Sequence, residues 1–316
     1  MTQTAAIRPV TSAADLSALV ALTNAETPDD PTSREELRWS DATYPGTSRF
    51  LAEVDGRVVG AATVGRIYVF PPEYPALWAT IVVAADARRQ GTGGALLRTV
   101  SERAHDAGKT GLHLRAWEAR PEGIAFLEHR GFTELERARM VRLELAGLPA
   151  PAIAMPEGVL LATLATRPDL VVGVHAVALE IFDDIQGGDE PMAVGDLAEF
   201  RGRNVDRPGI PPDAFMIALD ATSDQVVGYA CLLMVPGSAT VAWHDMTGVR
   251  RAWRGRGIAT ELKRATIGWA IQHGLDALET GNDEANAGMQ AVNARLGYQP
   301  LPDEVIMRGP LVGGGA

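Results

Sequence analysis

The residues best suited to do chemistry lie in two short glycine-rich stretches that repeat one pattern 166 residues apart. They read Arg88-Arg-Gln-Gly-Thr-Gly-Gly94 and Arg254-Gly-Arg-Gly-Ile-Ala-Thr260. An apolar, strand-like run precedes each stretch, and a helical pattern follows it. A glycine-rich loop that opens a helix directly after a strand presents backbone N–H groups at the positive end of the helix dipole. Both stretches are therefore predicted to bind a pyrophosphate.

Neither loop has the common nucleotide-binding patterns. The dinucleotide fingerprint needs three glycines at G-x-G-x-x-G, and a Walker loop needs Lys and then Ser or Thr after its glycines. The pattern Arg-x-x-Gly-x-Gly/Ala instead resembles the acetyl-CoA signature of the GCN5-related N-acetyltransferase (GNAT) family. The stretches Phe126–Phe132 and Asn293–Tyr298 also resemble this family's late helix, which ends in Gly and an aromatic residue. Since both halves match, the chain resembles a tandem two-domain member of the family.

The resemblance implies an α/β fold present in two tandem copies. Each copy is expected to be a mostly antiparallel mixed sheet, splayed between its fourth and fifth strands, with flanking helices. Each half has the pattern strand, helix, three strands, helix, strand, helix, strand, and Asp55-Gly56 predicts a hairpin turn. Gly147, Pro149, Pro151 and Pro156 interrupt residues 146–158. We therefore expect one domain over residues 1–147 and another over residues 156–316.

The same resemblance implies acetyl-CoA as the cofactor and indicates which backbone segments hold it. These segments are the end of the fourth strand and the loop after it. In the first half they comprise Ile81, Val82, Val83, Arg88, Arg89, Gln90, Gly91, Thr92, Gly93 and Gly94, and in the second half Thr247, Gly248, Val249, Arg254, Gly255, Arg256, Gly257, Ile258, Ala259 and Thr260. Asn286 is implied to contact the cofactor's arm, although Asn is also a good helix N-cap.

The two halves differ where a catalytic base would lie. Aligning the loops puts the apolar run 77–80 opposite residues 243–246, and only the second half has titratable groups there, His244 and Asp245. Strand side chains alternate between faces, so only one of the two can point into the cleft. Counting by two from Val249 favours Asp245 as the base over His244, although a bulge would shift this register. In the other interpretation, Asp245 is a solvated carboxylate and a water relay takes the proton.

The general acid is not identified by the sequence. Many family members have a Tyr four residues before the Gly of the late helix, and these positions here hold Leu127 and Asn293. The candidate catalytic residues are thus Asp245, His244 and Asn286, all in the second half. The first half keeps its loop, so we expect it to bind acetyl-CoA without turnover or only to support the fold.

Charge and composition limit the partners. The chain carries a net charge of −11, and residues 151–316 hold most of the excess, with 12 basic against 21 acidic residues. This balance argues against nucleic acid and favours a cationic partner. No apolar run is long enough for a membrane span, the six His show no metal spacing, and the single Cys231 is expected to be a buried, inert thiol. The cytoplasm is the expected location.

These observations favour an acetyl-CoA-dependent N-acetyltransferase. It would transfer the acetyl group to the primary amine of a small, cationic acceptor by direct attack, with base assistance in the C-terminal domain. Three alternatives remain: another acyl-CoA, an oxygen acceptor, or a non-catalytic tandem sensor of acyl-CoA. The resemblance implies that two polar stretches, residues 26–48 and 183–212, cover the acceptor pockets.

Overall fold

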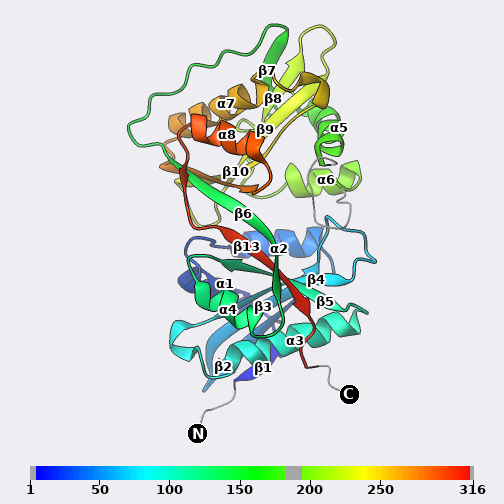
Figure 1. Cartoon of the computed structure of the whole chain (residues 1–316), viewed down its shortest axis with the longest axis vertical. Coiled ribbons are helices and arrows are strands. Elements are labelled where there is room, and N and C mark those ends of the chain that lie inside the picture. Colours follow the sequence, from blue (N-terminus) through cyan, green and yellow to red (C-terminus); the bar gives the residue numbers. More distant parts are fainter. Residues whose placement is uncertain (1–4, 183–193, 314–316) are drawn as a thin grey trace. The chain divides into compact units, whose positions relative to one another are not determined.

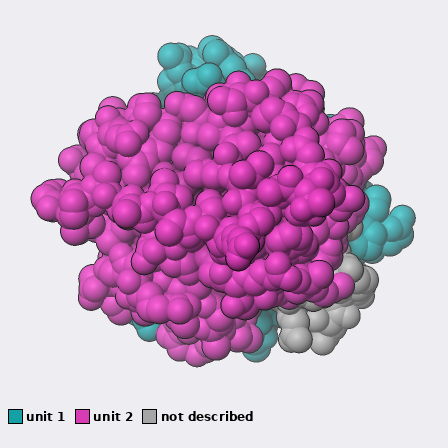
Figure 2. Space-filling model, turned by 90° about the horizontal axis from the view of Figure 1, so that it is seen from above, with its two compact units in different colours: residues 1–137, 303–316 teal, residues 138–302 magenta. Residues whose placement is uncertain are grey.

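A computed structural model describes residues 5–182 and 194–313 of the chain. The chain divides into two compact units, which are coloured separately in Figure 2. Unit 1 comprises Met1–Arg137 together with Asp303–Ala316, and unit 2 comprises Ala138–Pro302. Each unit therefore includes a segment that belongs to the other copy of the sequence repeat.

Unit 1 is a mixed sheet with helices on both faces (Figure 1). Its strand order is β1-β2-β3-β4-β5-β13, and only the β4–β5 pair is parallel. Helix α1 packs through Leu19 on one face, whereas α3 and α4 pack on the other. The elements are β1 (Ala6–Pro9), α1 (Ala13–Glu26), α2 (Arg34–Thr43), β2 (Ser48–Val54), β3 (Arg57–Arg66), β4 (Ala76–Val83), η1 (Ala85–Ala87), α3 (Thr92–Asp106), β5 (Gly111–Trp117), α4 (Pro121–Glu128) and β13 (Glu304–Pro310).

Unit 2 repeats this plan with the strand order β7-β8-β9-β10-β11-β6. Again the central pair, β10–β11, is the parallel one. Helices α5 and α6 pack on one face of the sheet, and α7 packs on the other. The elements are β6 (Thr133–Glu144, which begins in unit 1), β7 (Val159–Thr163), η2 (Pro168–Leu170), α5 (Val171–Phe182), α6 (Leu197–Asn204), β8 (Met216–Asp220), β9 (Val226–Met234), β10 (Val241–Val249), η3 (Arg251–Trp253), α7 (Ile258–Gln272), β11 (Ala277–Asp283), α8 (Ala287–Arg295) and β12 (Gln299–Pro300).

The two units exchange their last strands. Strand β6 closes the first sequence copy, but it pairs with β11 of unit 2, where Leu143 lies opposite Leu278. Strand β13 closes the second copy, but it pairs with β5 of unit 1, where Met307 lies opposite Leu114. The compact units therefore differ from the division at residues 1–147 and 156–316 that the sequence suggests, because a strand's place in the repeat does not decide which sheet edge it joins.

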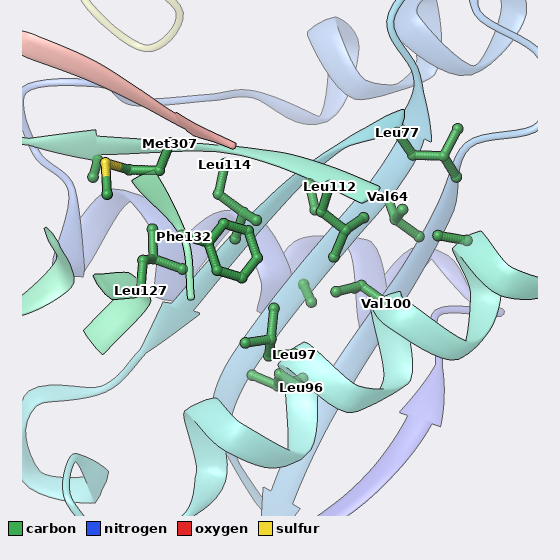
Figure 3. Close-up of a cluster of buried hydrophobic side chains, with 14 of the residues drawn as sticks. Val64, Leu77, Leu96, Leu97, Val100, Leu112, Leu114, Leu127, Phe132 and Met307 are labelled. Carbon is green, nitrogen blue, oxygen red and sulfur yellow. The ribbon is translucent and has the colours of Figure 1, made fainter. Parts of the chain in front are cut away.

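Strand β13 contributes to the core of unit 1. Val305 and Met307 are fully buried among side chains of α3, β5 and the segment after α4. Figure 3 shows Met307 beside Leu114 and Phe132. Phe132 also packs so closely on Gly309 that a Cβ there would come within 2.3 Å of the Phe132 ring. The exchanged strand is thus part of the hydrophobic core and not an edge addition.

Shortening one buried side chain on each exchanged strand should destabilise the unit whose sheet that strand joins. Met307→Ala removes a buried side chain from unit 1, and Leu143→Ala removes one from unit 2; each should cost about 2–5 kcal/mol of stability. We expect hydrogen exchange to quicken in β5 for Met307→Ala and in β11 for Leu143→Ala. Faster exchange in the sheet of the same sequence copy would contradict the strand exchange.

Most elements expected from the sequence are present. The Asp55-Gly56 hairpin is confirmed, with both residues at positive φ. The polar stretches 26–48 and 183–212 contain helices α2 and α6, whose bounds the sequence analysis did not predict; residues 183–193 lie outside the described part of the chain. Ser33, three residues before Glu36, marks the start of α2 and accepts the Glu36 N–H. None of the described helices has the length and apolarity that a membrane span needs.

Candidate functional site

In both units the sheet opens between its two parallel strands. The β4–β5 pairing ends at Ala79 and Leu114, and the β10–β11 pairing ends at Trp243 and Glu279. Beyond these pairs β4 and β10 remain bonded only to their antiparallel neighbours, β3 and β9. We call each opening the splay of its unit. It gives each unit a gap in the sheet that leads directly to a glycine-rich loop.

Peptide groups of the fourth strand point into each splay. Successive peptides of a strand face opposite edges, and the Ala84 and Arg250 N–H groups donate to β3 and β9 respectively. The peptides one residue earlier, at Val83 and Val249, therefore face the splay, as does that of Thr247. Strand β4 keeps a regular register, whereas β10 has a bulge between His244 and Thr247. Only unit 2 therefore combines a splay with a kinked fourth strand.

The two glycine-rich loops have the same backbone conformation. Each begins with a short 3-10 turn, and each helix starts at an N-cap glycine with positive φ, Gly91 at 91° and Gly257 at 86°. Arg89 and Gly255 also share positive φ. In the described structure neither helix has a side-chain cap, and a Cβ at Gly91, Gly255 or Gly257 would meet no atom within 4 Å. Both helix N-termini are thus uncapped and have open space beside their N-cap glycines, as an anion site requires.

The signature arginine fixes the loop to the strand before it. Arg88 Nε donates to Val83 O over 3.1 Å, and Arg254 Nε donates to Val249 O over 3.0 Å. Arg88 also forms ion pairs with Glu26 and Glu122. The sequence analysis assigned Arg88 and Arg254 to cofactor binding; their contacts indicate that they act by holding the loop in shape.

Unit 1 concentrates positive charge at its loop. The guanidinium groups of Arg98 and Arg130 both lie 3.8 Å from the point where a Gly94 Cβ would stand. Burial lowers the pKa of Arg130, and the charges of Arg89 and Arg98 lower it further. In unit 2 the corresponding residues, found 166 positions later, are Gly255, Arg264 and Leu296. Three arginines gathered against their mutual repulsion favour a multiply charged anion at the start of α3.

Asp245 lies at the bulge of β10, on the face covered by α5 and α6. Cys231 Sγ lies 3.9 Å from its Oδ2, and Trp243, on the same face, packs with the α5 core. A Cβ on Gly248 would strike Ile181 of α5, so Gly248 faces α5 and its neighbours Thr247 and Val249 face α7. The bulge therefore separates Asp245 from Thr247 and Val249, in contrast to the count by two from the sequence. Burial raises the pKa of Asp245, and the Arg207 charge offsets part of the rise.

His244 points the opposite way and is fully buried. Its Nε2 lies 3.0 Å from Thr266 Oγ1, whose single proton goes to Lys263 O, so the imidazole donates there. Its Nδ1 then accepts the Tyr298 hydroxyl over 2.9 Å. Burial, reinforced by the Lys263 charge, lowers the pKa of His244 well below its usual range. His244 therefore has no free lone pair, and its hydrogen bonds link β10 to α7 and to Tyr298.

Three further polar side chains of unit 2 bear on the site. Asn286 is the N-cap of α8, and its side-chain oxygen accepts the Met289 N–H, which is the capping role allowed for it by the sequence. Asn293 on α8 is 2% exposed, and neither polar atom of its amide has a partner among the described residues. The Thr247 hydroxyl, on the splay strand, is similarly buried and unpartnered. Buried polar atoms are normally paired, so these two point to a ligand.

The sequence analysis missed Lys263 and Tyr298. Lys263 of α7 is 1% exposed, and its Nζ lies 5.2 Å from the centre of the Tyr298 ring. Burial lowers its pKa to about 7. A residue-by-residue comparison of the two halves would have found it, because the position 166 residues earlier holds Leu97.

Comparison with known proteins finds one family twice in the chain. The model of the acetyltransferase (GNAT) family matches residues 16–132 and 180–298. A mycothiol acetyltransferase from Mycolicibacterium vanbaalenii is 30% identical over 72% of this chain and 72% of its own length. One from Nocardia farcinica is 26% identical and covers 83% of this chain and 82% of its own.

Solved structures share the fold over nearly the whole chain. A tandem GNAT protein from the clavulanic acid biosynthesis pathway has a TM-score of 0.80 and 21% identity, covering 98% of this chain and 100% of its own. A GCN5-related N-acetyltransferase from Sphaerobacter thermophilus has a TM-score of 0.75 and 21% identity, with coverage of 98% and 97%. The resemblance drawn from the loops, and the α/β fold in two tandem copies, are confirmed.

Proposed function

Since the chain belongs to the GNAT family of acetyltransferases, we propose that it moves the acetyl group of acetyl-CoA to the primary amine of a small acceptor, and that unit 2 performs this reaction. Acetyl transfer from acetyl-CoA is the activity of the family. The acceptor, the catalytic unit and the roles of single residues are our proposal. The observation that carries it is the half-buried carboxylate of Asp245 at the bulge of the unit 2 splay.

The residues of both loops fit acetyl-CoA. The glycines leave open space at the N-termini of α3 and α7, where first-turn N–H groups can receive the pyrophosphate. In unit 2 the buried, unpartnered atoms of Thr247 and Asn293 offer hydrogen bonds to the cofactor's amide arm. We propose that Ile81–Val83 and the loop 88–94 bind acetyl-CoA in unit 1, and that Thr247–Val249 and the loop 254–260 bind it in unit 2.

Asp245 would take the proton from the acceptor's amine. Only the free amine has a lone pair for attack on the thioester carbonyl carbon, so a nearby base accelerates the reaction. A carboxylate of raised pKa suits this work better than a solvated one. The splay-facing N–H of Thr247 or Val249 would stabilise the negative charge that develops on the carbonyl oxygen. His244 would hold β10 in place, and Asn286 would fix the start of α8.

Unit 1 lacks these groups. The position that corresponds to Asp245 holds Ala79, which is fully buried, and β4 has no bulge within its pairing to β3. Its loop nevertheless has Arg89, Arg98 and Arg130 close together, as an anion site requires. We therefore propose that unit 1 binds acetyl-CoA and does not turn it over.

An acceptor screen tests the proposed reaction. The relatives are mycothiol acetyltransferases, so the unacetylated precursor of mycothiol is the first acceptor to try, followed by small diamines. The acidic excess of residues 151–316 is compatible with a cationic amine. We expect acceptor-dependent release of the CoA thiol and one acetyl group on the acceptor's nitrogen, measured by mass spectrometry. Acetylation of a hydroxyl, or faster turnover of propionyl-CoA, would contradict the proposed acceptor or acyl group.

A further inference from the structure

Unit 2 contains a buried polar cluster at a place where unit 1 is apolar. We call it the Lys263 cluster; its members are Lys263, His244, Thr266, Tyr298 and Asn293. The residues 166 positions earlier are Leu97, Trp78, Val100, Phe132 and Leu127. Four of these belong to the hydrophobic core drawn in Figure 3. The same fold is therefore stable with apolar side chains at these positions. The stability of the fold does not explain why unit 2 has polar groups there.

Hydrogen bonding within the cluster satisfies some of its members only. Tyr298 donates to His244, His244 donates to Thr266, and Thr266 donates to the main chain of α7. The two remaining groups have no such partner in the described parts of the chain, 5–182 and 194–313. No acidic side chain pairs with Lys263 Nζ, and neither amide atom of Asn293 is bonded. A buried cation and a buried amide left open together favour an anionic or polar ligand.

The cluster lies where the unit 2 splay begins. His244 directly follows the last paired residue of β10, and its carbonyl accepts the Thr280 hydroxyl of β11 over 2.9 Å. Lys263 and Asn293 both contact Tyr298, one over its ring and the other through the backbone. Helical side chains lean toward the N-terminus of their helix. Lys263, in the second turn of α7, therefore leans toward the loop that opens at Gly257.

We propose that Lys263, assisted by Asn293 of α8, returns the proton to the cofactor sulfur as the acetyl group is transferred. This inference rests on the proposed function of unit 2. As the acceptor nitrogen bonds to the carbonyl carbon, the C–S bond breaks and its electron pair goes to sulfur. Lys263 Nζ gives one proton to that sulfur and becomes a neutral amine, and Asn293 Nδ2 donates a hydrogen bond to it. Asp245 holds the proton from the acceptor, and water later restores both groups.

Lys263 has the chemistry that this step needs. An acid works best when its pKa is near the working pH, and burial lowers the pKa of Lys263 to about 7. The titratable side chains that face it are His244 from β10 and Tyr298 after α8. Burial moves both away from neutral pH, lowering the pKa of His244 and raising that of Tyr298. Lys263 is thus the member of the cluster able to exchange a proton near pH 7.

The thiol pKa of bound CoA tests this assignment without turnover. It is measured from thiolate absorbance in the Gly94→Glu background, in which we expect only unit 2 to bind. Lys263→Arg, which keeps a charged group at this place, should lower the pKa of the bound thiol by about one unit or more relative to Lys263→Met. In the parent, whose Lys263 is neutral above a pH of about 7, the thiol pKa should stay close to that of Lys263→Met. Equal thiol pKa values in Lys263→Arg and in Lys263→Met would overturn the proposal.

Measurements of kcat distinguish an effect of the charge at residue 263 from delivery of a proton by Lys263. Both Lys263→Met and Lys263→Arg should lower kcat by about 100-fold, because the Arg guanidinium does not release its proton. Asn293→Leu, which introduces the residue that unit 1 has at this place, should lower kcat by about 10-fold. Full kcat in Lys263→Arg would show that charge alone suffices and would overturn proton delivery.

Stability measured against pH gives a third readout, on the protein alone. Because the pKa of Lys263 is lowered in the folded state, the unfolded chain binds the extra proton between pH of about 7 and about 10.4. Stability of unit 2 should therefore rise with pH over this range, and Lys263→Met should flatten the rise. If Asp245→Asn abolishes acetylation while the Lys263 variants shift neither readout, only this inference fails. If no amine is acetylated but the thiol pKa differs between Lys263→Arg and Lys263→Met, only the proposed acceptor fails.

Discussion

Asp245→Asn should lower kcat about 100- to 1,000-fold while the Kd for acetyl-CoA stays within about twofold. The expected loss is that of a positioned general base. Asn keeps the shape of the side chain, so the bulge of β10 and the packing against Cys231 should remain. The effect should therefore fall on kcat and not on cofactor binding. Turnover is measured as thiol release with the best acceptor of the screen, and binding is measured by calorimetry.

The pH dependence of kcat/KM tests the same role of Asp245. Asp245 accepts a proton only as the carboxylate, and burial raises its pKa above the usual range for Asp. kcat/KM should thus rise as pH rises through that raised pKa, and Asp245→Asn should remove this limb. The matched control is Asp276→Asn, an exposed acidic residue between α7 and β11, which should retain full activity. An unchanged acid limb in Asp245→Asn would remove Asp245 from the role of base and favour a water relay.

The second large effect concerns how many molecules of acetyl-CoA bind. We expect two sites by calorimetry, one at each loop. Gly94→Glu and Thr260→Glu place a carboxylate at the third residue of α3 and of α7, where the pyrophosphate is expected. Each variant should lose one site, with affinity for that site falling more than 100-fold. In unit 1 the new carboxylate can pair with Arg98 and Arg130 and so fill the anion site.

These positions are chosen so that folding is preserved. An acidic residue in the first turn of a helix is stabilising, and neither position has a positive φ, unlike the N-cap glycines Gly91 and Gly257. The melting temperatures of both variants should therefore stay at or slightly above that of the parent. A single site in the parent that only Thr260→Glu removes would make unit 1 a scaffold and would contradict binding at its loop.

Local sequence patterns predicted most of the fold, but they did not predict the strand exchange. The Asp55-Gly56 turn, the loops and their helices depend on residues close in sequence, and the sequence places them well. Strands β6 and β13 each close one copy of the sequence repeat, and their local sequences do not indicate which sheet each of them completes. Leu143 fits against Leu278, and Met307 fits against Leu114. That choice depends on contacts more than 130 residues apart, which periodicity does not encode.

The sequence likewise predicted only the local parts of the candidate site. The sequence identified the loops from glycine spacing, and their left-handed backbone is present at Gly91 and Gly257. It favoured Asp245 over His244 by counting by two from Val249, but the bulge between His244 and Thr247 breaks that count. Lys263 escaped notice because a lone Lys on a helix is normally solvated. Its burial depends on Tyr298, which follows α8 and is distant in sequence.

The most direct test of catalysis in unit 2 is the rate of acetyl transfer by Gly94→Glu and Thr260→Glu, measured side by side with saturating acceptor. We predict that Gly94→Glu keeps kcat/KM for acetyl-CoA within about threefold of the parent and that Thr260→Glu lowers it more than about 100-fold. The reverse pattern, or an equal loss in both variants, would contradict the assignment of catalysis to unit 2.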